Sequence, residues 1–128
     1  METKRDIATR EDLLILMTEF YKKLLADPSI NYLFTDIAKI DLEKHLPVLV
    51  DFWDNVLFGS DTYRKNAMEP HLHLHRLSPL NSEHFKTWLG YFRQSTDELF
   101  DGPQAFRIKE RATSIATIMQ IKMHPKNT

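Results

Sequence analysis

The sequence predicts an all-α fold, and three features support this prediction. Apolar residues recur three and four positions apart over most of the chain, which is the period of a helix with one buried face. Alternating apolar and polar residues, the pattern typical of strands, are few. The chain also has only three glycines among its 128 residues, and no internal repeat or low-complexity tract. Together these features predict four main helices and one long irregular connection.

The first helix is expected to begin after Thr9. Thr9 and Asp12 have the spacing of an N-terminal capping box, with aspartate in place of the usual glutamate. The pair Asp27-Pro28 should end the helix, and a short piece over residues 29–35 follows it. The apolar stripe of this helix consists of Leu13, Leu16, Met17, Phe20, Tyr21, Leu24 and Leu25.

The second helical pattern starts near Asp41 and runs to Gly59, a suitable C-terminal cap. Pro47 lies inside the pattern, so we expect either a kink there or a delayed start at about His45. The predicted inward face consists of Leu42, His45, Leu49, Phe52, Trp53 and Val56, with Trp53 as core packing.

Helical periodicity disappears between residues 60 and 80. This stretch contains two prolines and the segment MEPHLHLHR, in which His71, His73 and His75 stand at alternate positions. A structureless connection of this length is uncommon inside a compact domain unless it is functional. The sequence therefore directs attention to the histidines.

Two further helices are expected over residues 81–100 and 104–123. Asp101-Gly102-Pro103 separates them, and Pro103 is well placed to begin the second of the two. The first carries Phe85, Trp88, Leu89, Phe92 and Leu99, and the second carries Ala105, Ile108, Ala112, Ile115, Ala116 and Met119.

Composition argues against several classes of function. Lys and Arg total 17 against 18 Asp and Glu, so the chain lacks the positive field that favours nucleic-acid binding. The absence of cysteine excludes disulfides, thiolate zinc sites and a cysteine nucleophile. The charged N-terminal stretch has no apolar signal core, and the longest apolar run, Leu13–Met17, is far below the ~20 residues of a membrane span. We expect a cytoplasmic protein that binds neither nucleic acid nor membrane.

The histidine segment has several readings on the residues alone. Alternating histidines suit metal binding on a strand, but strands are weakly indicated here. On a helix, His71 and His75 would share a face, as metal-binding pairs often do. No Glu-x-x-His signature accompanies them, which argues against a carboxylate-bound di-iron bundle. Exposure to solvent without any function is the remaining reading.

Tyr21, His45 and Trp88 lie on the apolar faces of three different predicted helices. Each alone is most often a core residue with a hydrogen-bond partner. Together they place more polar atoms in the interior than a packed core needs, because each buried polar group must be satisfied. A ligand bound at the centre of the bundle would satisfy all three.

Short characteristic segments follow one another over nearly the whole chain. They are Phe20-Tyr21, His45-Leu-Pro, Phe52-Trp53, Pro70-His71-Leu72, His84-Phe85, Trp88-Leu89, Asp97-Glu-Leu-Phe-Asp-Gly-Pro103 and Arg111-Ala-Thr-Ser-Ile-Ala116. In this order and spacing, the segments resemble a truncated haemoglobin of group III. The resemblance runs from about residue 10 to residue 122 and implies one truncated-globin domain over 1–128. In such a domain two pairs of helices form a two-over-two sandwich around a haem, and the helix with the iron ligand is short and follows a loop.

The resemblance also implies roles for single residues around one haem b per chain. His71 is the proximal ligand of the iron. On the distal side the resemblance places Tyr21, His45 and Trp88 as groups that stabilise the bound ligand. The pocket lining is Phe34, Leu49, Leu72, Phe85 and Met119. Arg76 and His75 are candidate partners of a haem propionate, and His73 receives no firm role.

The implied function is tight binding of O2 and of similar ligands such as NO and CO. Conversion of O2 and NO to nitrate is the leading reaction, and it requires an unidentified electron-donating reductase. A peroxidase-like role, or a gas sensor or store, is the alternative within the haem class. From other classes, a non-haem metal-binding bundle and a cofactor-free interaction module remain open. We expect a monomer or weak homodimer.

Overall fold

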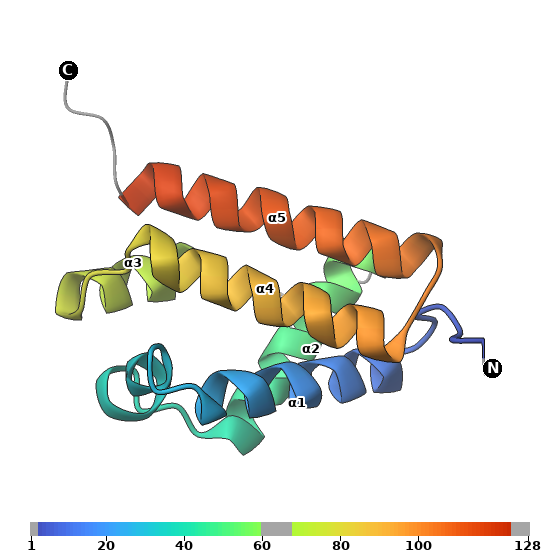
Figure 1. The fold of residues 1–128 in the computed structure, drawn as a ribbon, viewed down its shortest axis with the longest axis horizontal. Helices are drawn as coiled ribbons and strands as arrows, with labels where there is room; N and C mark the ends of the chain where they lie inside the picture. Colours follow the sequence, from blue (N-terminus) through green and yellow to red (C-terminus); the bar gives the residue numbers. More distant parts are fainter. Residues whose placement is uncertain (1–2, 60–67, 124–128) are drawn as a thin grey trace.

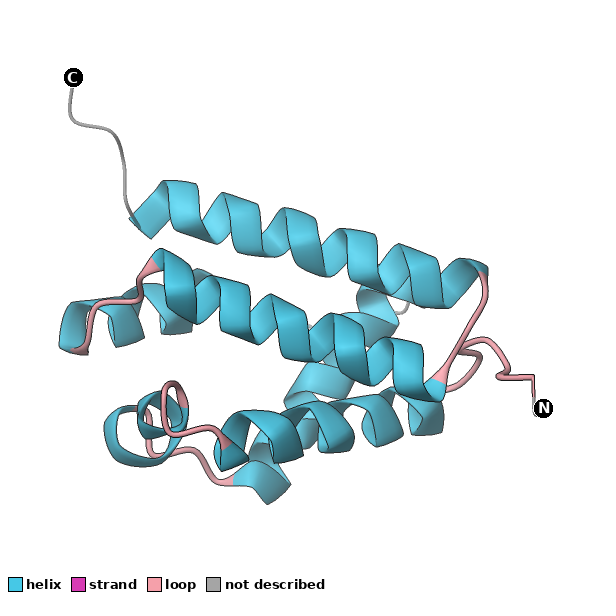
Figure 2. Ribbon diagram, in the orientation of Figure 1, coloured by secondary structure: helices cyan, strands magenta, loops and turns pink. Residues whose placement is uncertain are grey.

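The computed structural model describes residues 3–59 and 68–123, except for the side chains of Met68, Glu69, Leu72 and His73. Its elements are all helical, which confirms the predicted class, and the described residues contain no strand (Figure 2). In chain order they are α1 (Arg10–Ala26), η1 (Leu33–Ile37, a π-helix), α2 (Leu42–Phe58), α3 (Met68–Leu77), α4 (Ser82–Leu99) and α5 (Pro103–Met123).

The long helices form two pairs, as the two-over-two sandwich predicts. α4 and α5 run side by side in opposite directions, α1 lies beneath α4, and α2 crosses behind (Figure 1). α3 lies at one end of this assembly, where it packs against η1 and α5. The core between the long helices contains Leu13, Leu16, Phe20, Leu24, Trp53, Phe92, Ile108 and Ala112.

The capping box predicted at the start of α1 is present in full. The Thr9 hydroxyl accepts the backbone N–H of Asp12, and the Asp12 carboxylate accepts the backbone N–H groups of Ala8 and Thr9 at 2.8 and 3.0 Å. Arg5 donates to both carboxylate oxygens of Asp12, which is only 1% exposed. The segment before α1 is therefore bound to the first turn of the helix.

α2 begins at Leu42 with Asp41 as its N-terminal cap, so the delayed start at His45 was wrong. Pro47 lies within the helix and has no backbone N–H to donate. The N-terminal cap and the packed face of α2 stabilise the helix despite this one missing hydrogen bond. Gly59 ends the helix in the left-handed conformation at φ 69°, as expected of a C-terminal cap.

The inward face of α2 differs from the predicted one. Trp53 is buried as predicted, but the other deeply buried positions are Val50, Asp54 and Leu57. The remaining predicted positions form a half-buried stripe beside this face. They are Leu42, His45, Leu49, Phe52 and Val56.

The prediction of an irregular chain from residue 60 to residue 80 was wrong over Met68–Leu77, which form α3. Its histidines alternate with apolar residues, so the segment has no clear helical period in sequence. Pro70 stands in the first turn, where a backbone N–H has no helical partner and proline is tolerated. Residues 60–67 lie outside the described part of the chain.

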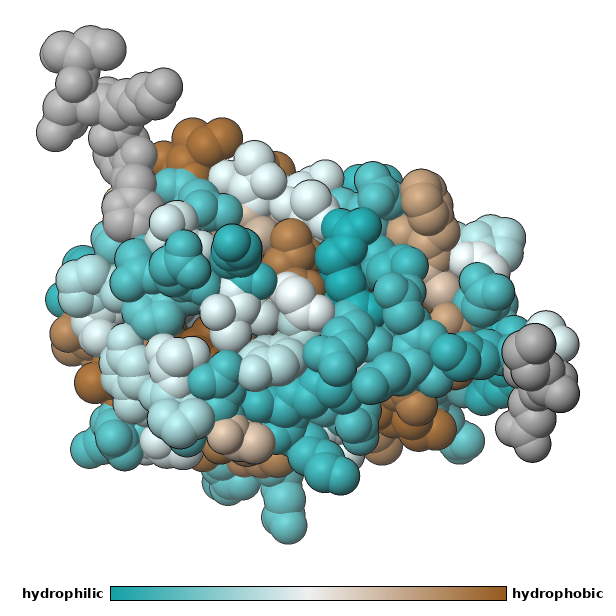
Figure 3. Space-filling view, viewed as in Figure 1, coloured by the Kyte–Doolittle hydropathy of each residue, from teal (hydrophilic) through white to brown (hydrophobic). Residues whose placement is uncertain are grey.

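The last two helices begin close to where the sequence places them. Asn81 caps α4 in a box that uses His84 at the third helical position, and Pro103 is the first residue of α5. The face that includes α4 is largely hydrophilic, with scattered apolar side chains (Figure 3). None of the described helices is long and apolar enough to cross a membrane.

The segment before α1 also reaches the other end of the sequence. The Asp6 carboxylate accepts the backbone N–H groups of Gln104 and Ala105 at 3.0 and 2.8 Å, in the first turn of α5. A side chain at Gly102 would meet Asp6, since a Cβ there would lie 2.6 Å from the Asp6 Cγ, and the φ of Gly102 is 141°. Only glycine suits this turn, and Asp6 serves as the cap of α5.

Stability in acid is expected to depend on Asp12. The hydrogen bond from Arg5 and those from the backbone lower the pKa of Asp12 to about 2 from 3.8. A carboxyl whose pKa is lower in the folded state stabilises the fold at pH values above its unfolded-state pKa. This stabilisation is lost as the pH falls through the folded-state pKa. We expect a loss of about 2 kcal/mol in unfolding free energy between pH 5 and pH 1. Denaturant titrations across this range, with Asp12→Asn losing less than wild type, would measure it.

Candidate functional site

Tyr21 and His45 are in direct contact between α1 and α2. Tyr21 lies in the last part of α1 and is 4% exposed, and its hydroxyl oxygen is 2.9 Å from Nε2 of His45 in the first turn of α2. The two rings meet edge-on with centroids 5.3 Å apart. Phe34 of η1 meets the Tyr21 ring in the same way at 5.5 Å. Three elements therefore converge on the Tyr21 side chain.

Burial controls the protonation of this pair. It raises the pKa of the Tyr21 hydroxyl, which therefore stays protonated at neutral pH. Burial lowers the pKa of His45, and positive charge on His71 lowers it further, so His45 is favoured in its neutral form. A neutral imidazole has one donor and one acceptor nitrogen. The pair can therefore exchange the direction of its hydrogen bond.

His71 lies in the first half of α3 and is exposed. Its charge acts on His45, so the two imidazoles lie within electrostatic range of each other although 26 positions separate them in sequence. α3 packs against η1, which carries Phe34. The structure thus brings His71 to the end of the bundle where Tyr21 and His45 meet.

Trp88 reaches the same region from α4. It is half-buried, stacks on Phe92 with centroids 5.5 Å apart, and meets Phe20 edge-on at 5.5 Å. Phe20 in turn meets Tyr21 edge-on at 5.5 Å. Phe20 therefore bridges Trp88 and Tyr21, and one aromatic cluster supports the three residues predicted to face the ligand.

The residues predicted to line the pocket come from five elements, one from each. Phe34 and Leu49 are half-buried on η1 and α2, and Phe85 and Met119 are buried on α4 and α5. The side chain of Leu72 lies outside the described part of the chain. The half-buried stripe of α2 includes Leu49 and His45, so apolar surface and a polar group are presented on one side of that helix.

His75 and Arg76 lie in the last turn of α3. Nδ1 of His75 accepts the backbone N–H of Leu80 at 2.9 Å, so the neutral ring carries its hydrogen on Nε2. Arg76 is exposed. Both groups suit a carboxylate partner: His75 as a hydrogen-bond donor through Nε2–H, and Arg76 as a cation.

The donor set fits a haem. His71 provides an imidazole of the kind that binds haem iron, and Tyr21 provides a protonated hydroxyl for the ligand side. The rings of Phe20 and Phe34 contact the Tyr21 ring, and α3 ends in groups suited to propionates. Among the described side chains, no group of three or more histidine, cysteine or acidic residues could hold a bare metal ion. The side chain of His73 is not among the described ones, so the non-haem metal site stays a hypothesis.

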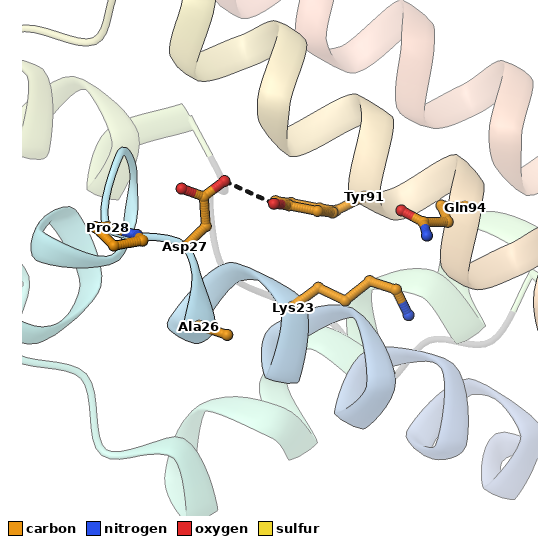
Figure 4. Close-up of a pocket in the computed structure, with 6 residues that line it drawn as sticks. All are labelled: Lys23, Ala26, Asp27, Pro28, Tyr91 and Gln94. Carbon is orange, nitrogen blue, oxygen red and sulfur yellow. Dashed lines mark hydrogen bonds between the residues drawn. The ribbon is translucent and has the colours of Figure 1, made fainter.

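An open hollow of about 400 Å³ lies elsewhere, between the end of α1 and the middle of α4 (Figure 4). Tyr91 of α4 donates a hydrogen bond of 2.6 Å to Asp27 beside it. None of the predicted site residues lines this hollow, whose lining is Lys23, Ala26, Asp27, Pro28, Tyr91 and Gln94.

A second tyrosine–histidine pair was not predicted from the sequence. The Tyr32 hydroxyl is 2.9 Å from Nε2 of His84, and the rings meet edge-on at 5.9 Å. The spacing of Asn81 and His84 is a sequence signal for a helix cap. Nothing in the sequence pairs His84 with a tyrosine 52 positions earlier.

Comparison with known proteins gives one consistent result. The family model described as bacterial-like globin matches residues 6–124. A group 3 truncated haemoglobin of Campylobacter jejuni is 28% identical over an alignment of 120 residues, and the match covers 91% of this chain and 92% of that protein.

The fold comparison agrees. The crystal structure of a group III truncated haemoglobin from Campylobacter jejuni superposes with a TM-score of 0.85 at 26% sequence identity. The match covers 98% of this chain and 99% of that one. The resemblance in the sequence, the two-over-two fold and the family match therefore agree: the chain belongs to the bacterial-like globin family, as a truncated haemoglobin of group III, and this membership implies a haem cofactor.

Proposed function

We propose that the chain binds one haem b, with His71 as the proximal ligand, and uses it to bind O2 and react it with NO. The observation that carries this proposal is the Tyr21–His45 contact, 2.9 Å long, within electrostatic range of His71. A buried hydroxyl and a neutral imidazole on one side, and a second imidazole on a separate short helix, are the parts of a two-sided haem site.

On the ligand side, the Tyr21 hydroxyl is the main donor. A diatomic ligand with partial negative charge is stabilised by fixed donors in a site that excludes water. His45 orients the hydroxyl: when its Nε2 carries the hydrogen, the imidazole donates to the Tyr21 oxygen and leaves the hydroxyl hydrogen for the ligand. Trp88, whose indole N–H can only donate, adds a second donor from α4.

The remaining residues hold the cofactor. Phe34, Leu49, Leu72, Phe85 and Met119 would contact the porphyrin through apolar side chains. Arg76 and the Nε2–H of His75 would bind propionate oxygens. When bound, the haem supplies the iron and the single electron that turns O2 and NO into nitrate, and a separate reductase would restore that electron.

The experiment that tests this assignment is a haem titration of the apoprotein with His71→Gly as the main variant. Wild type should reach a one-to-one endpoint in the Soret band and a five-coordinate ferrous spectrum. His71→Gly should lose that spectrum and regain it on addition of imidazole, because the free ring can enter the space left by the side chain.

His73→Gly is the matched control, since it removes an imidazole from the same helix at the same cost in helix propensity. It should titrate as wild type does. A five-coordinate spectrum that survives His71→Gly, or that is lost equally in His73→Gly, would contradict the assignment of the proximal ligand.

The proposed reaction has its own measurement. One equivalent of NO added to the oxygenated ferrous protein should give one equivalent of nitrate and the ferric protein, and further turnover should require an added electron donor. A peroxidase-like role is the second candidate. It uses the other tautomer of the neutral His45 ring, in which Nε2 has a lone pair that could accept a proton from a peroxide at the ligand side. Steady-state oxidation of a donor dye by H2O2, lost in His45→Leu while nitrate formation persists, would support that second role.

A further inference from the structure

Tyr32 and His84 have a fixed hydrogen-bond direction. Nδ1 of His84 accepts the backbone N–H of Asn81 at 3.2 Å, so Nδ1 has a lone pair and the neutral ring carries its hydrogen on Nε2. Burial lowers the pKa of His84, which favours this neutral form. Nε2–H therefore donates to the Tyr32 oxygen across 2.9 Å. One imidazole caps α4 and at the same time binds the segment before η1.

A second contact joins the same two parts of the chain. Tyr91 of α4 donates to the Asp27 carboxylate at 2.6 Å (Figure 4). His84 and Tyr91 are seven residues apart, which places them on one face of α4, with Trp88 between them on that face. We call the Tyr32–His84 and Asp27–Tyr91 bonds together the α4 clamp. It binds both ends of the segment 27–32 to the stripe of α4 that presents Trp88.

The clamped segment leads directly into η1 and Phe34. Backbone bonds inside it make it compact, among them Ile30 N–H to the Asp27 carbonyl at 3.1 Å and Asn31 N–H to the same carbonyl at 2.8 Å. Phe34 then meets the Tyr21 ring at 5.5 Å. A movement of Tyr32 relative to α4 would therefore move Phe34 against Tyr21.

We propose that Tyr32 and His84 are positioning residues for the ligand side of the haem site: their bond holds Phe34 against Tyr21, and so holds the Tyr21 hydroxyl in place relative to Trp88. This rests on the proposed function, because it concerns how the site grips its ligand. Tyr32 and His84 act through Phe34 and Tyr21, and neither is assigned a contact with the ligand.

The test separates the two tasks of His84 with two amide variants. His84→Asn places an amide near the Nδ1 position, so it can keep the helix cap while it is too short to reach Tyr32. His84→Gln places its amide nitrogen near the Nε2 position, so it can donate to Tyr32 again. Tyr32→Phe removes the acceptor and leaves the cap intact. All are measured as haem-loaded ferrous protein.

We expect Tyr32→Phe and His84→Asn each to speed O2 release by about 3- to 10-fold, as expected for coupling through packed side chains. Both should also raise the C–O stretching frequency of the CO complex, because a less well-placed hydroxyl exerts a weaker positive potential on the ligand. His84→Gln should return both values towards wild type. The double variant that combines Tyr32→Phe with His84→Asn should release O2 no faster than either single variant, since the two residues make one bond.

Several results would overturn the proposal. Wild-type O2 release and C–O frequency in both Tyr32→Phe and His84→Asn would leave the bond a merely structural contact. An effect confined to the His84 variants, with Tyr32→Phe behaving as wild type, would exclude the Tyr32–His84 bond as its cause. Tyr21→Phe, measured in parallel, separates this failure from a wider one. If it speeds O2 release while Tyr32→Phe does not, only the positioning role fails, and if neither does, the proposed function fails too.

Discussion

Replacing Tyr21 with phenylalanine is expected to speed O2 release from the ferrous, haem-loaded protein by about 10- to 100-fold. The hydroxyl is buried and stays protonated because burial raises the pKa of Tyr21. Contacts with His45 and Phe34 hold the Tyr21 side chain in place. A hydrogen bond to a charged acceptor contributes about 1.5–3 kcal/mol, and its loss acts on dissociation. Stopped-flow displacement of O2 by CO measures the rate directly.

The CO complex is the matched control for this variant. Bound CO has less negative charge than bound O2, so its dissociation should change far less in Tyr21→Phe. An equal change for both ligands would indicate a general opening of the pocket instead of a lost donor. An unchanged rate of O2 release would mean that the hydroxyl donates to His45 and not to the ligand, which would contradict the role proposed for it.

Replacing Asp12 with alanine is expected to lower the free energy of unfolding by about 2–4 kcal/mol. The carboxylate is 1% exposed and accepts the backbone N–H groups of Ala8 and Thr9 as well as Arg5. Its removal leaves those donors unpaired and breaks half of the capping box. This expected loss of unfolding free energy is smaller than the loss on breaking a fully buried ion pair, because the Arg5 side chain is 62% exposed.

Glu11→Ala is the control for this second variant. Glu11 is the preceding residue, it is exposed, and it also lies in the first turn of α1, so its loss should change stability by no more than about 0.5 kcal/mol. Chemical denaturation at one fixed haem concentration compares the three proteins, because a ligand of the folded state shifts the apparent stability of each. Equal stability of Asp12→Ala and Glu11→Ala would mean that Arg5 and the cap contribute nothing measurable.

Four helix ends could be predicted because their signals are local. Thr9 with Asp12, Asp41 with Gly59, and Pro103 act on backbone groups within a few residues, and each is found where the sequence places it. The hydrophobic pattern missed α3 because histidines at alternate positions hide its period, and only the resemblance implied a short helix there. The inward face of α2 was misplaced because the angle at which it crosses α1 decides whether Leu49 or Val50 is buried more deeply, and that angle depends on tertiary packing.

The candidate site was predictable in its members and not in its contacts. Helical spacing placed Tyr21, His45 and Trp88 on inward faces. The 2.9 Å contact of Tyr21 with His45, and the bridge through Phe20 to Trp88, follow only from how three helices meet. The Tyr32–His84 bond is a further example, since it joins a turn to a helix cap 52 positions away.

The bonds from Asp6 to the start of α5 bear on how the chain folds during synthesis. Asp6 emerges from the ribosome before the helices of the domain, and its partner Ala105 is made 99 residues later. At about 5–20 residues per second, the nascent chain waits several seconds before this cap can close. Until then α1 and α4 can associate, but the Asp6 carboxylate still lacks the two backbone N–H groups of α5 that it accepts. Closure of the fold is therefore a late event, and a ribosome stalled before residue 105 would hold a chain that cannot complete it.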